Sequence, residues 1–313
     1  EDTDLQGNYF IIFNRLGFST LIVITLITIY YQVIIAWTIF YMAASFTSEL
    51  PWGSCHHDFN TDQKHKIEVN AKLLKQLETS KELVVREKIY IWKEKDLIWK
   101  VLSSEEYFRD YALGINGADW EDFGSPRWQN VLCLLLSYII LYLCLMKGVE
   151  SSGKAAYFTA IFPYIILIAL LIRSTTLHGS YDGIMFYVTP DWSKLTDASV
   201  WGDAASQTFY ALGIGCGSLV TLASYSRFKN NCHRDAFFVS IANALTSVLA
   251  GFVVFATLGF LAKELDVGVD EVVASGPGLA FVTYAEAVLH MPIPTLWGIL
   301  FFFMLFTLGI GSQ

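Results

Sequence analysis

The sequence predicts an all-α protein that crosses a membrane several times, and three observations support this prediction. Hydrophobic residues make up 54% of the 313 residues and charged residues only 16%, a charge content well below that of soluble domains. Several separate runs are long enough to cross a bilayer, which takes about twenty apolar residues. One of these runs is interrupted half-way by three glycines, and glycine weakens a helix.

The interrupted run covers residues 205–231, and its centre, at residues 213–217, reads GIGCG. Each glycine weakens a helix by about 1 kcal/mol relative to alanine. Unsatisfied backbone at membrane depth is tolerated only where it is buried in protein or lines a watery cavity. The run therefore predicts two half-helices with an unwound joint, a pattern that marks the binding site of secondary transporters.

Six membrane segments are predicted, the last of them truncated. We expect the chain to be a fragment, because it begins at Glu1 and ends inside an apolar run. The predicted segments are 18–46, two helices within 129–174, the broken helix 203–227, 235–263 and 293–313. The remaining parts are a stub (1–17) and three polar connections (47–128, 175–202 and 264–292).

Short loops predict the orientation. The turn after the broken helix carries Arg227, Lys229 and Arg234, and cytoplasmic loops are enriched in Lys and Arg. Counting back, the stub 1–17 is cytoplasmic and region 47–128 is extracellular, in a protein of the plasma membrane. We interpret the Lys- and Glu-rich centre of that region as a solvated, partly helical loop. The net charge is −8 and no basic stripe is interleaved with aromatics, so we expect no nucleic-acid partner.

A small set of polar residues lies inside the apolar runs. Gln207 precedes the break, and Ser312 lies in the last segment. Asn243 and Ser247 are four residues apart and therefore share a helix face. Oxygen atoms of amides and hydroxyls suit Na⁺, whereas their N–H and O–H groups suit an anion. The alternative, which stays open for each residue, is that it only hydrogen-bonds a neighbouring helix.

Two tyrosines have competing interpretations. Aromatic residues in membrane helices most often pack or anchor the helix at the interface. Tyr210 comes just before the break, so its ring can cover a substrate there, and the hydroxyl of Tyr31 can reach a substrate carboxylate. Free backbone N–H groups from Ser218 onward favour an anionic group on the ligand. We therefore predict a small carboxylated substrate.

Seven stretches of the sequence, in chain order, resemble the neurotransmitter:sodium symporter family (solute carrier family six), whose members have the LeuT-type inverted-repeat transporter fold. The matching stretches are YYQVIIAWTIFYMAASFTSELPWGSC, KGVESSGKAAYFTAIFPYIIL, VWGDAASQTFYALGIGCG, ASYSRFKNNCHRDAF, SIANALTS, GPGLAFVTYAEA and FFFMLFTLGIGS. The resemblance implies a partial fold that covers family helices three to eight. Helices one and two, and everything after helix eight, are then absent from this chain.

The resemblance also implies roles for individual residues. The implied substrate contacts are Tyr31, Tyr210, Gly213, Gly215 and Cys216. The implied sodium ligands are Ala211, through its carbonyl, and Asn243 for one ion, and Leu308, through its carbonyl, and Ser312 for another. Gln207 and Ser247 match chloride ligands, and Tyr225 matches a tyrosine of the cytoplasmic gate.

Four features depart from the family pattern. Ala211 lacks the Ser or Thr hydroxyl that serves the first sodium and chloride sites, which weakens the chloride prediction more than the sodium prediction. Gly311 stands where monoamine and GABA carriers have Asp. Cys55 matches half of the family disulfide, but region 47–128 has no second cysteine, so we predict a thiol unpaired within that loop. The same region lacks an N-x-[ST] glycosylation site.

Together these features predict a sodium-coupled symporter that imports an amino acid or amino-acid-like neurotransmitter, with chloride as a second candidate ion. No covalent chemistry is expected, so the protein is not predicted to be an enzyme. Two alternatives stay open: a monoamine or GABA carrier, and a receptor-like member of the family that does not transport. The expected partners are the substrate and the lipid bilayer, and the sequence neither requires nor excludes an oligomer.

Overall fold

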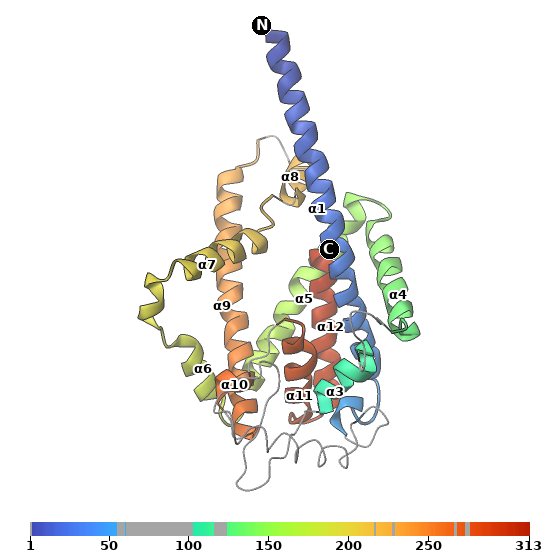
Figure 1. Ribbon diagram of the computed structural model, residues 1–313, viewed down its shortest axis with the longest axis vertical. Helices are drawn as coiled ribbons and strands as arrows, with labels where there is room; N and C mark the ends of the chain where they lie inside the picture. Colours follow the sequence, from blue (N-terminus) through green and yellow to red (C-terminus); the bar gives the residue numbers. More distant parts are fainter. Residues whose placement is uncertain are drawn as a thin grey trace, which may run out of the picture. The chain divides into compact units, whose positions relative to one another are not determined.

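Regular structure in this protein consists of helices (Figure 1). The computed structural model describes residues 2–54, 60, 103–115, 124–215, 217–226, 229–265, 268–272 and 276–313, and no strand occurs among them. The predicted all-α class is therefore confirmed for this part of the chain. The chain folds as two compact units. The first unit is Glu1–Tyr31 with Tyr187–Phe252, and the second unit is Gln32–Phe186 with Val253–Gln313.

Within the described residues, five helices are long and apolar enough to cross a membrane, and they coincide with five of the six predicted segments. They are α1 (Asp2–Ala44), α4 (Trp128–Leu145), α5 (Val149–Thr175), α9 (Cys232–Leu265) and α12 (Pro294–Ser312). Helix α1 extends back through the predicted stub, since no proline interrupts it there. Its membrane-length part is Gly17–Ala44. The sixth predicted segment is the broken one.

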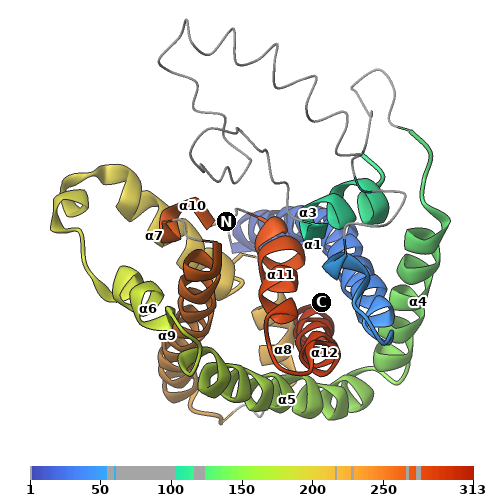
Figure 2. The ribbon, with the colours of Figure 1, turned by 90° about the horizontal axis from the view of Figure 1, so that it is seen from below.

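The core of the second unit is aromatic. The ring centroid of Tyr41, on α1, lies 5.2 Å from that of Trp52 and 4.9 Å from that of Phe302 on α12. Buried aromatic rings each remove a large apolar area from solvent and gain further from tilted and edge-to-face contacts. Helix α12 runs alongside α5 (Figure 2). This core therefore ties the membrane-length helices of the second unit together.

Parts of the predicted connections fold into short helices that complete this core. These are η1 (Pro51–Gly53), α3 (Ser103–Glu106), the π-helix η2 (Tyr107–Leu113), the π-helix η4 (Leu279–Thr283) and α11 (Tyr284–Leu289). The fully buried Trp52 donates its Nε1–H to the carbonyl of Ala285 at 2.9 Å. Ser103 in turn donates its hydroxyl to the carbonyl of Trp52 at 2.6 Å. Segments predicted only as links are thus structural parts of the second unit.

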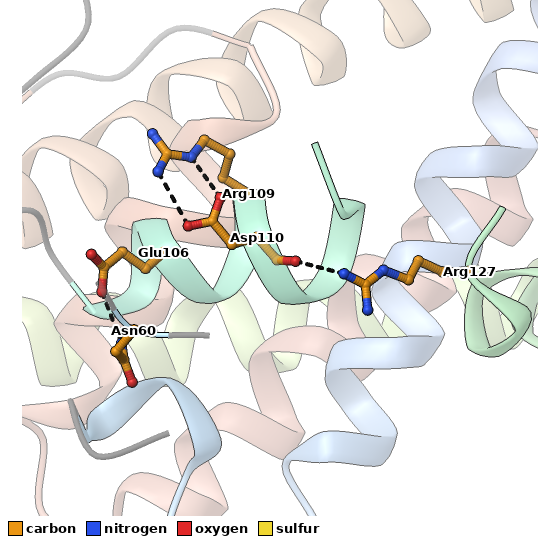
Figure 3. A network of polar contacts seen from close by, with 5 residues as sticks. All are labelled: Asn60, Glu106, Arg109, Asp110 and Arg127. Atoms are coloured by element: carbon orange, nitrogen blue, oxygen red, sulfur yellow. Dashed lines mark hydrogen bonds and ion pairs between the residues drawn. The ribbon is translucent and has the colours of Figure 1, made fainter. Parts of the chain in front are cut away.

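A polar network holds residues 103–115 against the start of α4 (Figure 3). The carboxylate of the buried Asp110 accepts two hydrogen bonds from Arg109, at 2.8 and 3.1 Å. Arg127 donates to the backbone carbonyl of Asp110 at 2.9 Å, and Asn60 donates to Glu106 at 2.9 Å. The hydrogen bond to Asp110 raises the pKa of Arg109. Cys55 and the predicted solvated loop centre (62–100) lie outside the described residues.

Helix α6 (Ser180–Val188) makes a very close contact with α9 within the second unit. A Cβ atom added to Gly183 would collide with the carbonyl of Phe255 and lie 2.8 Å from the Cα of Gly259. Two glycines facing one another let these backbones approach. Since a side chain at either position would separate the helices, this contact fixes where α6 meets α9.

Helix α10 (Val269–Val272) also lies in the second unit, and the first unit contains the remaining helices. They are the 3₁₀-helix η3 (Trp192–Thr196), α7 (Ala198–Ala211), α8 (Ser218–Ser224) and residues 232–252 of α9. Asp197 is the N-cap of α7, and its carboxylate accepts a hydrogen bond from the backbone N–H of Ser199 at 3.0 Å. Such a cap satisfies a donor that the first helical turn leaves free. It explains why α7 begins earlier than the predicted boundary at residue 203.

Candidate ion and substrate site

The broken helix of the prediction is present as two helices joined by a non-helical stretch. Helix α7 ends at Ala211 and α8 begins at Ser218 (Figure 1). The three glycines between them have positive φ angles of 63° (Gly213), 86° (Gly215) and 80° (Gly217). Residues with a Cβ atom rarely adopt this left-handed region. The glycines therefore mark the place where the chain must leave the helix.

The end of α7 is a Schellman motif with Gly213 as its left-handed residue. The N–H of Gly213 bonds the carbonyl of Tyr210 at 3.0 Å, and the N–H of Ile214 bonds the carbonyl of Phe209 at 3.1 Å. This pair of bonds is the usual way in which a left-handed glycine satisfies the last carbonyls of a helix. The carbonyl of Ala211 takes part in neither of these bonds. It lies in the last turn of α7, where backbone carbonyls have no N–H donor four residues later in the helix. This is the atom that the sequence predicts as a sodium ligand.

Three predicted ligand residues share one face of α7. Gln207, Tyr210 and Ala211 are three and four residues apart, which places them on neighbouring rows of the helix. All three are exposed in this chain, and 65% of Tyr210 is accessible. The face thus presents an amide, a phenol and a backbone carbonyl directly before the joint.

The start of α8 lies against α1 within the first unit. A Cβ atom added to Gly217 would lie 2.5 Å from the Cγ2 of Thr20, so a side chain has no room there. No atom lies within 4 Å of a Cβ added to Gly215. Gly217 is therefore required by both its φ angle and its surroundings, and Gly215 by its φ angle alone. Cys216, a predicted substrate contact, lies outside the described residues.

Asn243 and Ser247 lie on one face of α9, as predicted. The Ser247 hydroxyl donates to the backbone carbonyl of Asn243 at 3.0 Å. Asn243 is half-buried and Ser247 is exposed. In this arrangement the oxygen of Ser247 keeps its lone pairs for a cation, whereas its only proton is already used. To bind an anion, the hydroxyl must first rotate away from the helix backbone.

Leu308 and Ser312 meet in the last turn of α12. The Ser312 hydroxyl donates to the carbonyl of Leu308 at 2.9 Å, so the two predicted sodium oxygens are adjacent. Leu308 is 43% exposed, and this end of the helix is open. Both oxygens retain lone pairs, which suits a hard cation.

Sequence reasoning missed Thr159 of α5, which lies beside this turn. A Cβ atom added to Gly311 would lie 3.0 Å from the Thr159 Oγ1 and 3.1 Å from its Cβ. The hydroxyl of Thr159 thus lies beside the place where a side chain at position 311 would begin. The only signal in the sequence was a threonine inside an apolar run, which packing explains equally well.

Two further predicted residues, Tyr31 and Tyr225, belong to the first unit. Tyr31 is half-buried near the middle of α1. Tyr225 follows the last residue of α8, and its backbone N–H bonds the carbonyl of Leu222 at 3.2 Å. Its side chain is exposed. The structure therefore brings together Asn243 with Ser247 in the first unit and Leu308 with Ser312 in the second.

Residues 8–313 match the model of the Sodium:neurotransmitter symporter family. The chain belongs to this family. It is 46% identical over 303 residues to the sodium- and chloride-dependent glycine transporter 1 of Xenopus laevis, a match that covers 96% of this chain and 47% of that protein. It is also 42% identical over 302 residues to the sodium- and chloride-dependent GABA transporter 2 of Rattus norvegicus, again covering 96% and 47%.

A third relative is the sodium- and chloride-dependent creatine transporter 1 of Homo sapiens, 41% identical over 307 residues, with 96% of this chain and 46% of that protein covered. The chain spans about half the length of the curated relatives it matches. The family consists of transporters, and the five apolar helices fit a multi-pass membrane protein.

A second residue that sequence reasoning missed is Gln32, next to Tyr31. It is fully buried, and its Nε2 donates to the Ser137 hydroxyl of α4 at 2.9 Å. The Ser137 hydroxyl in turn donates a hydrogen bond to the carbonyl of Leu134 at 2.7 Å. This bond links α1 to α4 and fixes the rotation of α1 at that level. Interhelical bonds between polar side chains stabilise helix packing in membranes.

Proposed function

We propose that this chain is part of a sodium-coupled symporter that imports an amino acid or amino-acid-like transmitter across the plasma membrane. The observation that carries the proposal is the glycine joint between α7 and α8, with Tyr210 and the carbonyl of Ala211 directly before it. The relatives are named as glycine, GABA and creatine transporters. Each of these three compounds carries a carboxylate, as does the substrate that the sequence predicts.

Two groups of oxygens are the proposed sodium ligands. The carbonyl of Ala211 and the amide oxygen of Asn243 would serve one ion. The carbonyl of Leu308 and the hydroxyl of Ser312, 2.9 Å apart, would serve the other. The hydroxyl of Thr159 is a further candidate beside this second group. Carbonyl, amide and hydroxyl oxygens are hard ligands, which Na⁺ prefers.

Gln207 and Ser247 are the proposed chloride ligands, through an amide N–H and a hydroxyl O–H. Chloride requires the Ser247 hydroxyl to leave the carbonyl of Asn243, to which it donates at 3.0 Å. Ala211 offers no side-chain donor. We therefore propose chloride as the weaker of the two ions, although the names of the relatives include both.

The substrate would lie at the joint, in contact with its backbone at Gly213 and Gly215, with Cys216, and with the rings of Tyr31 and Tyr210. Tyr225, after α8, is the proposed cytoplasmic gate residue. Region 47–128 would be extracellular. Sodium and substrate can drive the transport cycle only if they bind one conformation more tightly than the other, because ligands of equal affinity shift no equilibrium.

The proposal is tested with the full-length protein in liposomes that have an inward sodium gradient. Uptake of radiolabelled glycine, GABA and creatine is measured with sodium and with choline as the external cation. We expect uptake of at least one of them only with sodium. Absence of sodium-dependent uptake for all three would contradict the proposed activity for these substrates.

A pair of glycine variants tests the joint itself. Gly215→Ala places a Cβ at a φ of 86° without any collision, so its cost is the left-handed backbone alone, about 1 to 2 kcal/mol. Gly202→Ala, in the middle of α7 and also free of neighbours within 4 Å, is the matched control. We expect Gly215→Ala to reduce sodium-dependent uptake about tenfold, since 1.4 kcal/mol corresponds to a factor of ten. Gly202→Ala should leave uptake unchanged.

One observation favours a second candidate, a receptor-like protein that binds substrate without transporting it. Ala211 lacks the hydroxyl that the family resemblance leads one to expect at the joint, which leaves only its carbonyl for ions. Sodium-dependent binding of a substrate, measured in detergent, together with no uptake into liposomes, would support this candidate over a transporter.

A further inference from the structure

His290, which directly follows α11, lies between Glu286 of α11 and Glu264 in the last turn of α9. The Nε2 of His290 is 3.6 Å from the Oε1 of Glu286, one turn earlier in the chain. Its Nδ1 is 4.0 Å from the Oε1 of Glu264, in the last turn of α9. The two carboxylates therefore face opposite nitrogens of one imidazole ring. All three residues belong to the second unit.

Burial makes the carboxylate of Glu286 dependent on His290 as its charge partner. Glu286 is only 8% exposed, and its Oε2 has no hydrogen-bond partner among the described residues. A buried carboxylate is costly unless it is paired. Glu264 is about half exposed, and the ring of Phe260 packs edge-on against the imidazole at 6.1 Å.

No other charged group of the described residues is placed to compete for His290. Helix α12, which follows it, contains no charged residue. Lys263, next to Glu264, lies against another segment, where a Cβ atom added to Gly179 would be 2.5 Å from the Lys263 Cβ. The charged groups that face the imidazole are therefore Glu286 from α11 and Glu264 from α9.

This arrangement requires a proton. Neutral imidazole has one N–H donor, whereas imidazolium has two, so only the protonated ring can donate toward both carboxylates. The neighbouring carboxylate of Glu286 raises the pKa of His290 most, partial burial opposes this effect, and the charge of Glu264 raises the pKa further.

We propose that His290, Glu286 and Glu264 form a proton-binding site that ties the end of α9 to α11. The tie acts on a segment that is already part of the buried core, since Ala285, next to Glu286, accepts the hydrogen bond from Trp52 at 2.9 Å. Protonation therefore tightens the contact of the 279–289 segment with α9, and deprotonation loosens it.

The direction of the pH effect follows from the raised pKa. A group with a higher pKa in the folded state stabilises that state fully below its unfolded value, about 6.5 for histidine. The stabilisation is lost as the pH rises through the folded pKa of His290, which lies above that value. The tie is thus present in mild acid and absent in mild alkali.

The experiment compares thermal midpoints of the full-length protein in detergent between about pH 5.5 and about pH 8.5, the range in which histidine titrates. His290→Gln is compared with wild type. His178→Gln, at an exposed histidine in the turn between α5 and α6, is the matched control. We expect wild type to exceed His290→Gln by about 1 to 3 °C at the acid end and by nothing at the alkaline end. His178→Gln should show no such pH-dependent difference.

A double-mutant comparison tests whether the tie reaches α9. Glu264→Gln should lower the midpoint of wild type at the acid end but should have no further effect in the His290→Gln background. Because Glu264 is about half exposed, this variant is expected to fold even if His290→Gln does not. The proposal is overturned if the difference between His290→Gln and wild type is the same at both ends of the range, or if Glu264→Gln alone leaves the pH profile unchanged. The readout is stability, so it does not depend on transport.

Discussion

The two units of this chain differ in what holds them together. Every described side chain that is buried lies in the second unit, where Tyr41 and Trp52 are fully enclosed by aromatic neighbours. In the first unit all described side chains are exposed or half-exposed. Most of the predicted ligand residues nevertheless belong to the first unit, and only Leu308 and Ser312 belong to the second.

The buried residues that stabilise the fold and most of the predicted ligand residues therefore lie in different units. The helices of the second unit are stabilised by close van der Waals packing of their buried side chains, which is the main source of helix association in a membrane. In the first unit, local hydrogen bonds define the helix ends, such as the Asp197 cap and the Schellman motif at Gly213. Substitutions in the second unit should therefore lower stability strongly, whereas those in the first should act locally and on ligand binding.

The largest effect is expected from Gly183→Ala, at the contact of α6 with α9. The new methyl group meets the backbone carbonyl of Phe255, which cannot move as a side chain can. Overpacking of this kind costs about 3 kcal/mol. The thermal midpoint of the purified protein measures it, with Gly153→Ala, which has no neighbour within 4 Å, as the control. Equal midpoints for the two variants would show that α6 does not pack on α9 in this way.

A matched pair of tryptophans compares the two units directly. Trp52 in the second unit and Trp201 in the first both donate Nε1–H to a backbone carbonyl, at 2.9 and 3.0 Å. Trp52 is fully buried, whereas Trp201 is 63% exposed. Trp52→Phe leaves a buried carbonyl without its donor and should cost about 2 kcal/mol. Trp201→Phe, where water replaces the donor, should cost about 0.5 kcal/mol or less. Similar losses in thermal midpoint for Trp52→Phe and Trp201→Phe would contradict the difference in burial between the two units.

The smallest effect is expected from Asp197→Ala, at the N-cap of α7. Loss of the cap should fray the first turn of α7 while the thermal midpoint stays nearly unchanged. Hydrogen exchange of the peptide that begins at Ala198 reports the fraying, and Asp197→Asn, which keeps a side-chain acceptor, is the control. The hydrogen bonds from Ser199 lower the pKa of Asp197. The cap is therefore at full strength above the unfolded pKa of aspartate and weakens as the pH falls through the lower folded value. Equal exchange in the Ala and Asn variants would contradict the assigned cap.

The parts of the fold that sequence reasoning predicted are those that depend on short stretches of chain. The membrane-length helices follow from runs of apolar residues, and the break between α7 and α8 follows from the glycines at 213, 215 and 217. The pair Asn243 with Ser247 follows from helical spacing, and the pair Leu308 with Ser312 came from the family resemblance. The ligand roles of these residues stay predictions, since spacing shows which groups are adjacent and not what they bind.

By itself, then, the sequence determined the helical class, the number of long apolar helices and the place of the interruption, because hydrophobic length and glycine backbone freedom are local properties. Only the tertiary structure decided that the 279–289 segment is buried against Trp52 and that Thr159 fills the space beside Gly311. It alone brought His290 between glutamates from two helices. These contacts join residues far apart in the chain, and they depend on how whole helices pack, which no local pattern records.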